Sequence, residues 1–200
     1  QVSTTAPETS AYAAHNSYVG KRARIACGAY LEDSYVLDES VVGKGSVISN
    51  VKLRNVTVPE NVVLHGLKLL DGRYVVRIYG VEDNPKGTLE KDACFLGTTL
   101  SAFLSGNGLT PEALWKDGEH YLWFAALYPA ADTMEEAIRS ALLVKKMAEH
   151  SASPEEIESW KNKERMSLYS SFNGADVLAI SKWQHELESR ILASKFVWAI

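Results

Sequence analysis

A short loop carries the residues of this sequence that are best suited to bind a phosphorylated or hydroxylated ligand. Arg77 ends a β-rich stretch, and Asp83, Asn84 and Lys86 follow it within ten positions. Arginine and lysine complement phosphate charge, whereas aspartate and asparagine hydrogen-bond to hydroxyl groups. We therefore predict that these four residues bind a sugar or a phosphate around loop 80–87. The same residue types also build solvated turns, and this alternative stays open.

Other potentially reactive side chains do not form a recognisable constellation. His150 and His185 lie in helical contexts without a second ligand at metal spacing. Cys27 and Cys94 also lack metal-type spacing, and we expect two buried free thiols. The sequence thus predicts no catalytic residue and no metal site in this chain.

The elements that must position the loop begin with a repeat. An apolar residue recurs every five or six positions, and small or polar residues such as Gly28 and Gly45 fall between. The recurring residues are Val19, Ile25, Leu31, Val36, Val42, Ile48, Leu53 and Val58. This hexapeptide repeat predicts a left-handed parallel β-helix over residues 17–70, in which stacked rungs bury the apolar positions. An antiparallel sandwich would show turn signals at a slower spacing of about 8–12 residues.

A mixed β and loop segment with short helices is expected at 71–130. Two β-rich runs, 62–69 and 74–79, flank Asp71-Gly72, which is a strong hairpin signal. Thr110-Pro111 is typical of a helix start. A cluster of aromatic residues follows, and such clusters more often form a packing interface than a ligand site. The cluster comprises Trp115, Tyr121, Trp123, Phe124 and Tyr128.

An α-helical linker region is expected at 131–200. Thr133 with Glu136 matches a capping box, and Ser153 precedes a second helix start. A third helix should run from about Ala175. Residues 1–16 carry little periodic pattern and are expected to be flexible. Because the chain starts with Gln1 and ends within a helical pattern, we expect a segment of a longer protein.

Composition narrows the partners and the location. The net charge of −4 argues against a nucleic acid or an anionic membrane as partner, and the 46% hydrophobic fraction is typical of a folded chain. The sequence contains no apolar run long enough to span a bilayer and no secretory signal, which predicts a cytoplasmic location.

Several short stretches together carry a family resemblance. They are 64–67 (LHGL), 77–87 (RIYGVEDNPKG), 95–97 (FLG), 127–129 (LYP), 133–137 (TMEEA), 165–168 (RMSL), 175–176 (AD) and Trp183. From about residue 16 onward, the chain resembles the L-fucokinase/GDP-L-fucose pyrophosphorylase family of bifunctional enzymes. The run 79–86 is the most specific part of this resemblance, because hexapeptide repeats occur in many transferases.

The resemblance implies a transferase of nucleotide-sugar metabolism. Such enzymes phosphorylate L-fucose with ATP and join fucose 1-phosphate to GTP, releasing pyrophosphate, with Mg²⁺ accompanying GTP and ATP. This chain would match the central β-helix and helical linker, between a nucleotidyltransferase domain and a GHMP-type kinase domain. The glycine-rich phosphate loops of both flanking domains are missing from the sequence. The segment is therefore expected to act mainly as scaffold and linker and to be inactive alone.

Two other functions remain open. The first is a standalone hexapeptide-repeat acyltransferase, for which His65 lies close to the repeats and His15 precedes them as candidate general bases. The second is a purely structural oligomerisation module, in which the chain would form a homo-oligomer. The long helical tail and the Asn84-Pro85-Lys86 loop do not suit the acyltransferase.

Overall fold

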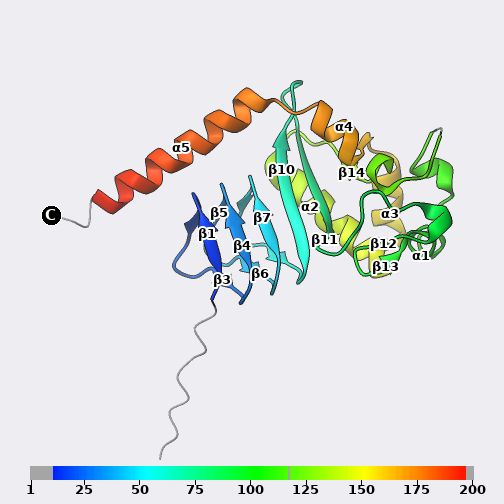
Figure 1. Ribbon diagram of the computed structural model, residues 1–200, viewed down its shortest axis with the longest axis horizontal. Helices are drawn as coiled ribbons and strands as arrows, with labels where there is room; N and C mark the ends of the chain where they lie inside the picture. The colour runs from blue at the N-terminus through cyan, green and yellow to red at the C-terminus, as the bar shows by residue number, and fades with distance from the viewer. Residues whose placement is uncertain (1–10, 117, 197–200) are drawn as a thin grey trace, which may run out of the picture.

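The molecule is a parallel β-helix that is closed at one end by a hairpin and helices (Figure 1). This computed structural model describes residues 11–116 and 118–196. The segment expected to be flexible is 1–16, and its residues 1–10 lie outside the described part of the chain. The coil begins at Ala13, four residues before the expected boundary at 17. Residues 13 and 14 are alanines, so the first strand carries no large apolar residue and the repeat pattern does not identify it.

Parallel strands stack into three sheets along the coil. The strands are β1 (Ala13–His15), β2 (Tyr18–Val19), β3 (Arg24–Ile25), β4 (Tyr30–Glu32), β5 (Tyr35–Val36), β6 (Val41–Val42), β7 (Val47–Ser49), β8 (Lys52–Leu53) and β9 (Thr57–Val58). Sheet orders are β1-β4-β7-β10-β11, β2-β5-β8 and β3-β6-β9. Every third strand in the chain therefore pairs, as in a three-sided coil, and the predicted β-helix is confirmed.

The repeat positions point into the coil. Leu31, Val36, Val42, Ile48 and Leu53 each have 0% of their surface exposed. In the first sheet, Leu31 pairs with Ile48, which pairs with Leu64, so that identical positions of successive turns stack. Burial of these layers supplies the stabilising free energy that a single rung cannot supply.

The corners require backbone conformations that few residue types adopt readily. At one corner, Asn16, Asp33 and Asn50 have φ values of 41°, 46° and 53°. At another, Gly28 and Gly45 have φ values of 70° and 65°. Asparagine, aspartate and glycine tolerate this left-handed region best, which explains their place between the apolar positions.

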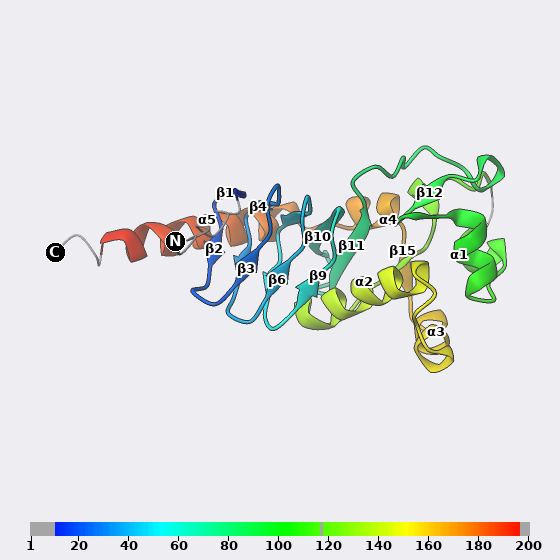
Figure 2. The ribbon, with the colours of Figure 1, turned by 90° about the horizontal axis from the view of Figure 1, so that it is seen from below.

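A hairpin and a helix cover the last turn. Strand β10 (Val62–Lys68) pairs in parallel with β7 and antiparallel with β11 (Tyr74–Gly80). Gly72, with φ of 92°, lies in the connecting turn, so the predicted hairpin is confirmed. Helix α2 (Met134–Ala148) lies against β11, β10 and β8 (Figure 2) and buries Ile138, Ala141 and Val144.

Short elements make up the rest of the described chain. They are η1 (Leu89–Lys91), β12 (Cys94–Phe95), β13 (Thr98–Thr99), α1 (Leu100–Gly106), η2 (Pro111–Ala113), η3 (Leu122–Phe124), β14 (Tyr128–Pro129), α3 (Pro154–Lys161), β15 (Arg165–Met166), α4 (Leu168–Asn173) and α5 (Val177–Phe196). Ser153 and Glu156 form a full capping box at α3. The start predicted at Thr110 yields only the single 3-10 turn η2.

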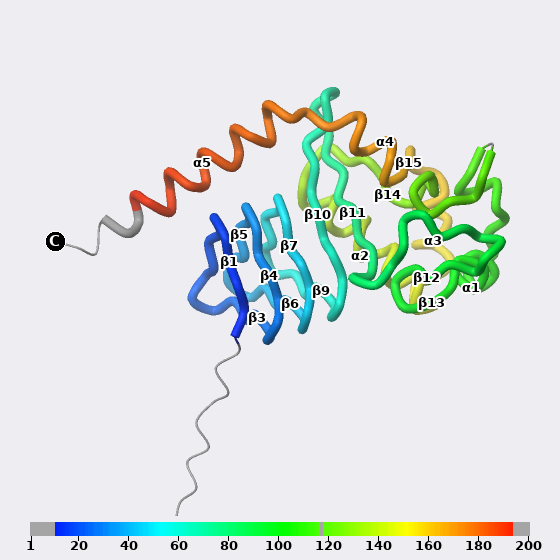
Figure 3. The backbone as a smooth tube through the Cα atoms, in the orientation of Figure 1, coloured from blue at the N-terminus to red at the C-terminus, as the bar shows by residue number. Residues whose placement is uncertain are grey.

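Helix α5 runs back along the outside of the coil (Figure 3). Trp183 Nε1 donates to Asp33 O at 2.9 Å, and Gln184 Nε2 donates to Asp33 Oδ2 at 2.8 Å and to Asn50 Oδ1 at 3.1 Å. The ring of Trp183 also meets Tyr35 edge-on, with ring centroids 5.4 Å apart. The corner residues of the coil thus also hold the helix.

The two cysteines were expected to be buried, and this expectation was wrong. Cys27 and Cys94 are free and exposed. Cys27 comes directly before the corner at Gly28, and Cys94 lies on the outward side of the short hairpin strand β12. Neither position belongs to the apolar repeat.

Among the described helices, none is long and apolar enough to cross a membrane.

Replacing Val42 by Asp should lower the free energy of unfolding by about 3–5 kcal/mol, because an unpaired carboxylate would enter the dry coil. Chemical denaturation followed by circular dichroism measures the change. Thr57→Asp is the matched control, since Thr57 is exposed in the same sheet. Equal stability of both variants would show that Val42 does not point inward.

Candidate substrate-binding site

Arg77 lies in the middle of β11, within a row of polar residues on the sheet that starts with β1. The register places Glu32 beside Ser49, Ser49 beside His65, and His65 beside Arg77. Since Leu31, Ile48 and Leu64 point into the coil, the adjacent positions of this row point to the opposite face. The Arg77 side chain is 7% exposed, and its Nη2 lies 2.5 Å from His65 Nδ1.

Among the described residues, the buried positive charge of Arg77 has no carboxylate partner. Burial, and next the charge of Arg77, lower the pKa of His65 to about 3. Burial also lowers the pKa of Arg77, but a guanidinium stays protonated in proteins. The neutral imidazole must therefore accept at Nδ1, and Arg77 Nε has no hydrogen-bond partner in the part of the chain that the structure describes. A His65 held in this way is a poor general base.

The Asp83 carboxylate fixes the loop that follows β11. It accepts hydrogen bonds from Gly80 N at 2.6 Å and from Leu96 N at 3.0 Å. A Cβ on Gly80 would lie 2.8 Å from Asp83 Oδ1, so a larger residue there would displace the carboxylate. Asn84 Oδ1 accepts from Lys86 N at 3.0 Å, which closes a local turn. Asp83 therefore ties the loop to the turn that follows β12, and Asn84 sets its bend.

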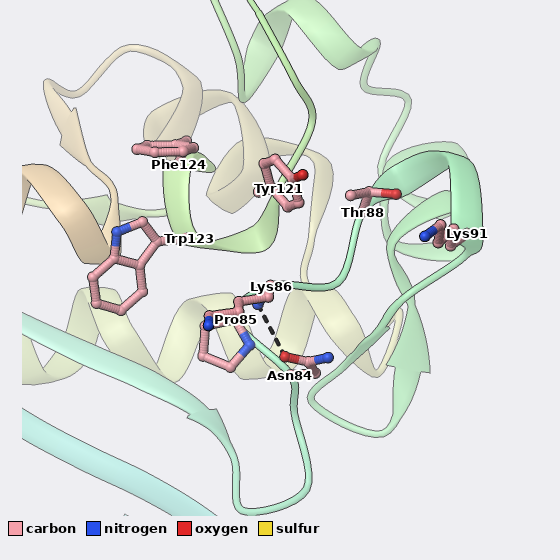
Figure 4. Close-up of a pocket in the computed structure, with 8 residues that line it drawn as sticks. All are labelled: Asn84, Pro85, Lys86, Thr88, Lys91, Tyr121, Trp123 and Phe124. Carbon is pink, nitrogen blue, oxygen red and sulfur yellow. Dashed lines mark hydrogen bonds between the residues drawn. The ribbon is translucent and has the colours of Figure 1, made fainter.

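The loop forms one wall of a cavity of about 740 Å³ (Figure 4). Its lining residues are Asn84, Pro85, Lys86, Thr88, Lys91, Tyr121, Trp123 and Phe124. Two backbone hydrogen bonds of 2.9 Å hold the opposite wall, from Trp123 N to Pro85 O and from Leu122 N to Gly87 O. The loop and the aromatic wall of η3 therefore form one connected unit.

The cavity combines apolar rings with positive charge. Among the described residues, neither Lys86 nor Lys91 has a carboxylate within ion-pair distance. A ligand with an apolar ring face and a phosphate would match both features. Within the described part of the chain, no cluster of three or more His, Cys, Asp or Glu side chains could hold a metal ion.

The structure brings together only part of the predicted binding set. Asn84 and Lys86 line the cavity, Asp83 supports the loop from behind, and Arg77 lies on β11 against His65. Sequence reasoning assigned the aromatic cluster to packing. This holds for Trp115 and Tyr128, which are buried in the core, whereas the remaining three members line the cavity. No local sequence signal joins these three rings to Lys86 and Lys91, because the two groups lie far apart in the sequence.

Comparisons with known proteins give two matches. A family model described as the fucose pyrophosphorylase domain matches residues 1–133, which include every residue that lines the cavity. The bifunctional fucokinase/GDP-fucose pyrophosphorylase of Arabidopsis thaliana is 32% identical over 100 residues, which cover 48% of this chain and 9% of that protein. The match thus spans less than a tenth of the relative's length. No solved structure matches this chain significantly.

The depressed pKa of His65 should make stability depend on pH. The pKa is about 3 in the folded state against the ordinary value of 6.5, so the unfolded state binds more protons between these values. Stability should be complete above pH 6.5 and fall by up to about 1.4 kcal/mol per pH unit as the pH drops toward 3.

Denaturant titrations at several pH values test this prediction. His65→Gln, which can still accept from Arg77, should flatten the profile in this window. His15→Gln should not, because His15 is exposed in the same row of the sheet. An unchanged profile in His65→Gln would contradict the prediction.

Proposed function

Since this chain belongs to the fucose pyrophosphorylase family, we propose that it is part of an enzyme that makes GDP-L-fucose during fucose salvage. The reaction joins fucose 1-phosphate to GTP and releases pyrophosphate. In a bifunctional parent enzyme, a kinase domain would also make fucose 1-phosphate from L-fucose and ATP. The observation that carries this proposal is the lysine and aromatic cavity within the matched residues 1–133.

In this proposal, the cavity binds fucose 1-phosphate. Fucose has an apolar ring face and a methyl group, both of which can pack against Trp123 and Phe124. The phosphate would lie between Lys86 and Lys91, which act as point charges. Because neither lysine is neutralised by a carboxylate, the phosphate does not have to displace one.

The other predicted binding residues support this arrangement in different ways. Asn84 offers its side-chain amide to a sugar hydroxyl, since the turn uses only its Oδ1. Asp83 keeps the loop in place through its bonds to backbone N–H groups. Arg77 adds a fixed positive charge on the strand that leads into the loop.

In this proposal, other domains of the parent enzyme bind the nucleotides and carry out the transfer reactions. Mg²⁺ binds through carboxylates and phosphate oxygens, and the residues that line the cavity include no carboxylate. The chain also has no glycine-rich phosphate loop. The flanking nucleotidyltransferase and GHMP-type kinase domains would hold GTP, ATP and Mg²⁺ in the cytoplasm, while this segment serves as scaffold and linker and contributes the sugar-phosphate side.

The 200-residue chain alone should form no GDP-fucose from fucose 1-phosphate and GTP, because it lacks the phosphate loop that catalysis requires. Chromatographic detection of nucleotide sugar measures this. Turnover by the purified chain would contradict the proposal that catalysis takes place in the flanking domains.

In the full-length enzyme, Lys86→Ala should raise KM for fucose 1-phosphate, or lower kcat, at least about tenfold, which corresponds to roughly 1.4 kcal/mol. Steady-state pyrophosphorylase assays measure this effect, and kinase activity and Tm should stay unchanged. Lys116→Ala is the matched control, because Lys116 is exposed outside the cavity. If Lys86→Ala and Arg77→Ala both leave the kinetics unchanged, the loop is purely structural.

A further inference from the structure

A second hollow lies where α5 passes the sheet β2-β5-β8, on a different part of the molecule from the aromatic cavity. It has a volume of about 350 Å³. Its lining residues are Tyr18, Tyr35, Leu37, Lys52, Arg54, Arg190 and Ile191, and we call it the coil groove. An adjoining hollow of about 280 Å³ shares Tyr18, Leu37 and Arg54 with it. Together they extend along the outer face of this sheet.

Strand register arranges the residues of the coil groove. Tyr18, Tyr35 and Lys52 occupy one row across β2, β5 and β8. Arg54 directly follows β8 and lines the same groove. Arg190 comes from α5, less than two turns beyond Trp183 and Gln184, which anchor that helix to the coil. Positive charge therefore faces the groove from both sides.

The three cations of the coil groove have no charged partner among the described residues, although the chain is acidic overall. Lys52, Arg54 and Arg190 have no ion pair and no side-chain hydrogen bond to any described residue. The carboxylate at the edge of the adjoining hollow, Asp38, is already engaged by Arg22 N at 2.9 Å. The net charge of −4 makes such an unpaired positive group a local exception.

We propose that the coil groove binds an organic phosphate. Its phosphoryl groups would lie between Lys52, Arg54 and Arg190, and the remainder would pack on the rings of Tyr18 and Tyr35. Arginine binds phosphate oxygens in a bidentate manner, and tyrosine rings offer apolar surface to a base or a sugar. This site is additional to the proposed sugar-phosphate cavity and does not depend on it.

Binding there would link α5 to the coil. Without a ligand, Arg190 on the helix and the cations on the coil repel each other across the groove. An anion between them replaces this repulsion by attraction on both sides. The bound ligand should therefore raise the Tm of the chain, and Arg190→Gln should remove this gain without lowering the Tm of the unliganded protein.

Isothermal titration calorimetry tests the site in a Lys86→Ala background, which disables the other proposed cavity. GTP, fucose 1-phosphate and pyrophosphate are titrated separately at about 50 mM salt, where surface charges are weakly screened. At least one organic phosphate should bind, and Arg54→Gln or Arg190→Gln should weaken it at least tenfold. Arg24→Gln is the matched control, because Arg24 is an exposed arginine on another sheet of the coil.

Comparison of the affinities for the three ligands distinguishes a nucleotide site from a sugar-phosphate site. Preference for GTP identifies a nucleotide site, and preference for fucose 1-phosphate identifies a sugar-phosphate site. Pyrophosphate binding as tightly as both would contradict the role of the tyrosine rings. No binding by any ligand, or equal weakening by Arg24→Gln, would overturn the proposal, whatever the kinetics of Lys86→Ala show about the proposed function.

Discussion

The structure depends on how the last turn of the coil is covered. A stack of parallel strands ends in a layer of apolar side chains and a row of unpaired backbone groups, and both are costly to leave in water. Here β10 runs on beyond the coil and pairs with β11 in antiparallel orientation, while α2 packs against both strands. The buried face of α2, which includes Ile138 and Val144, supplies the apolar surface that a further rung would have supplied. The hairpin strand β11 and helix α2 thereby cover this end of the coil.

The same covering strand determines where the candidate site lies. Strand β11 ends at Gly80, and loop 80–87 begins there. Asp83 holds the start of this loop through its hydrogen bond to Gly80 N. The aromatic wall of η3 then attaches to that loop through backbone bonds at Pro85 and Gly87. A buried guanidinium on the covering strand costs desolvation free energy, and His65 satisfies only part of its hydrogen-bonding capacity. Such an uncompensated buried charge is more typical of a functional site than of a stabilising contact.

Sequence patterns predicted the parts of the fold that local physics decides. The apolar repeat from Val19 to Val58 identified the coil, because each buried position of the repeat needs an apolar residue. Asp71-Gly72 identified the hairpin. Tertiary contacts decided the rest. The Thr110 signal produced only a 3-10 turn, and the cavity joins lysines near position 86 to aromatic residues near position 123 through backbone bonds that no periodicity reveals. Arg77 and Asp83 are close in sequence but serve different surroundings, because strand alternation turns Arg77 toward His65 while Asp83 turns back to Gly80.

The regularity of the coil gives the protein an adjustable spacer. Each turn uses 16 or 17 residues, as the register of Tyr30 with Val47 and of Val47 with Val63 shows. One turn advances the stack by about 4.8 Å, the distance between neighbouring strands. Insertion or deletion of one whole turn would leave every remaining layer with the same kind of neighbours above and below. Evolution or an engineer can therefore change the separation between the first strands and the aromatic cavity in strand-sized steps, without redesigning either end.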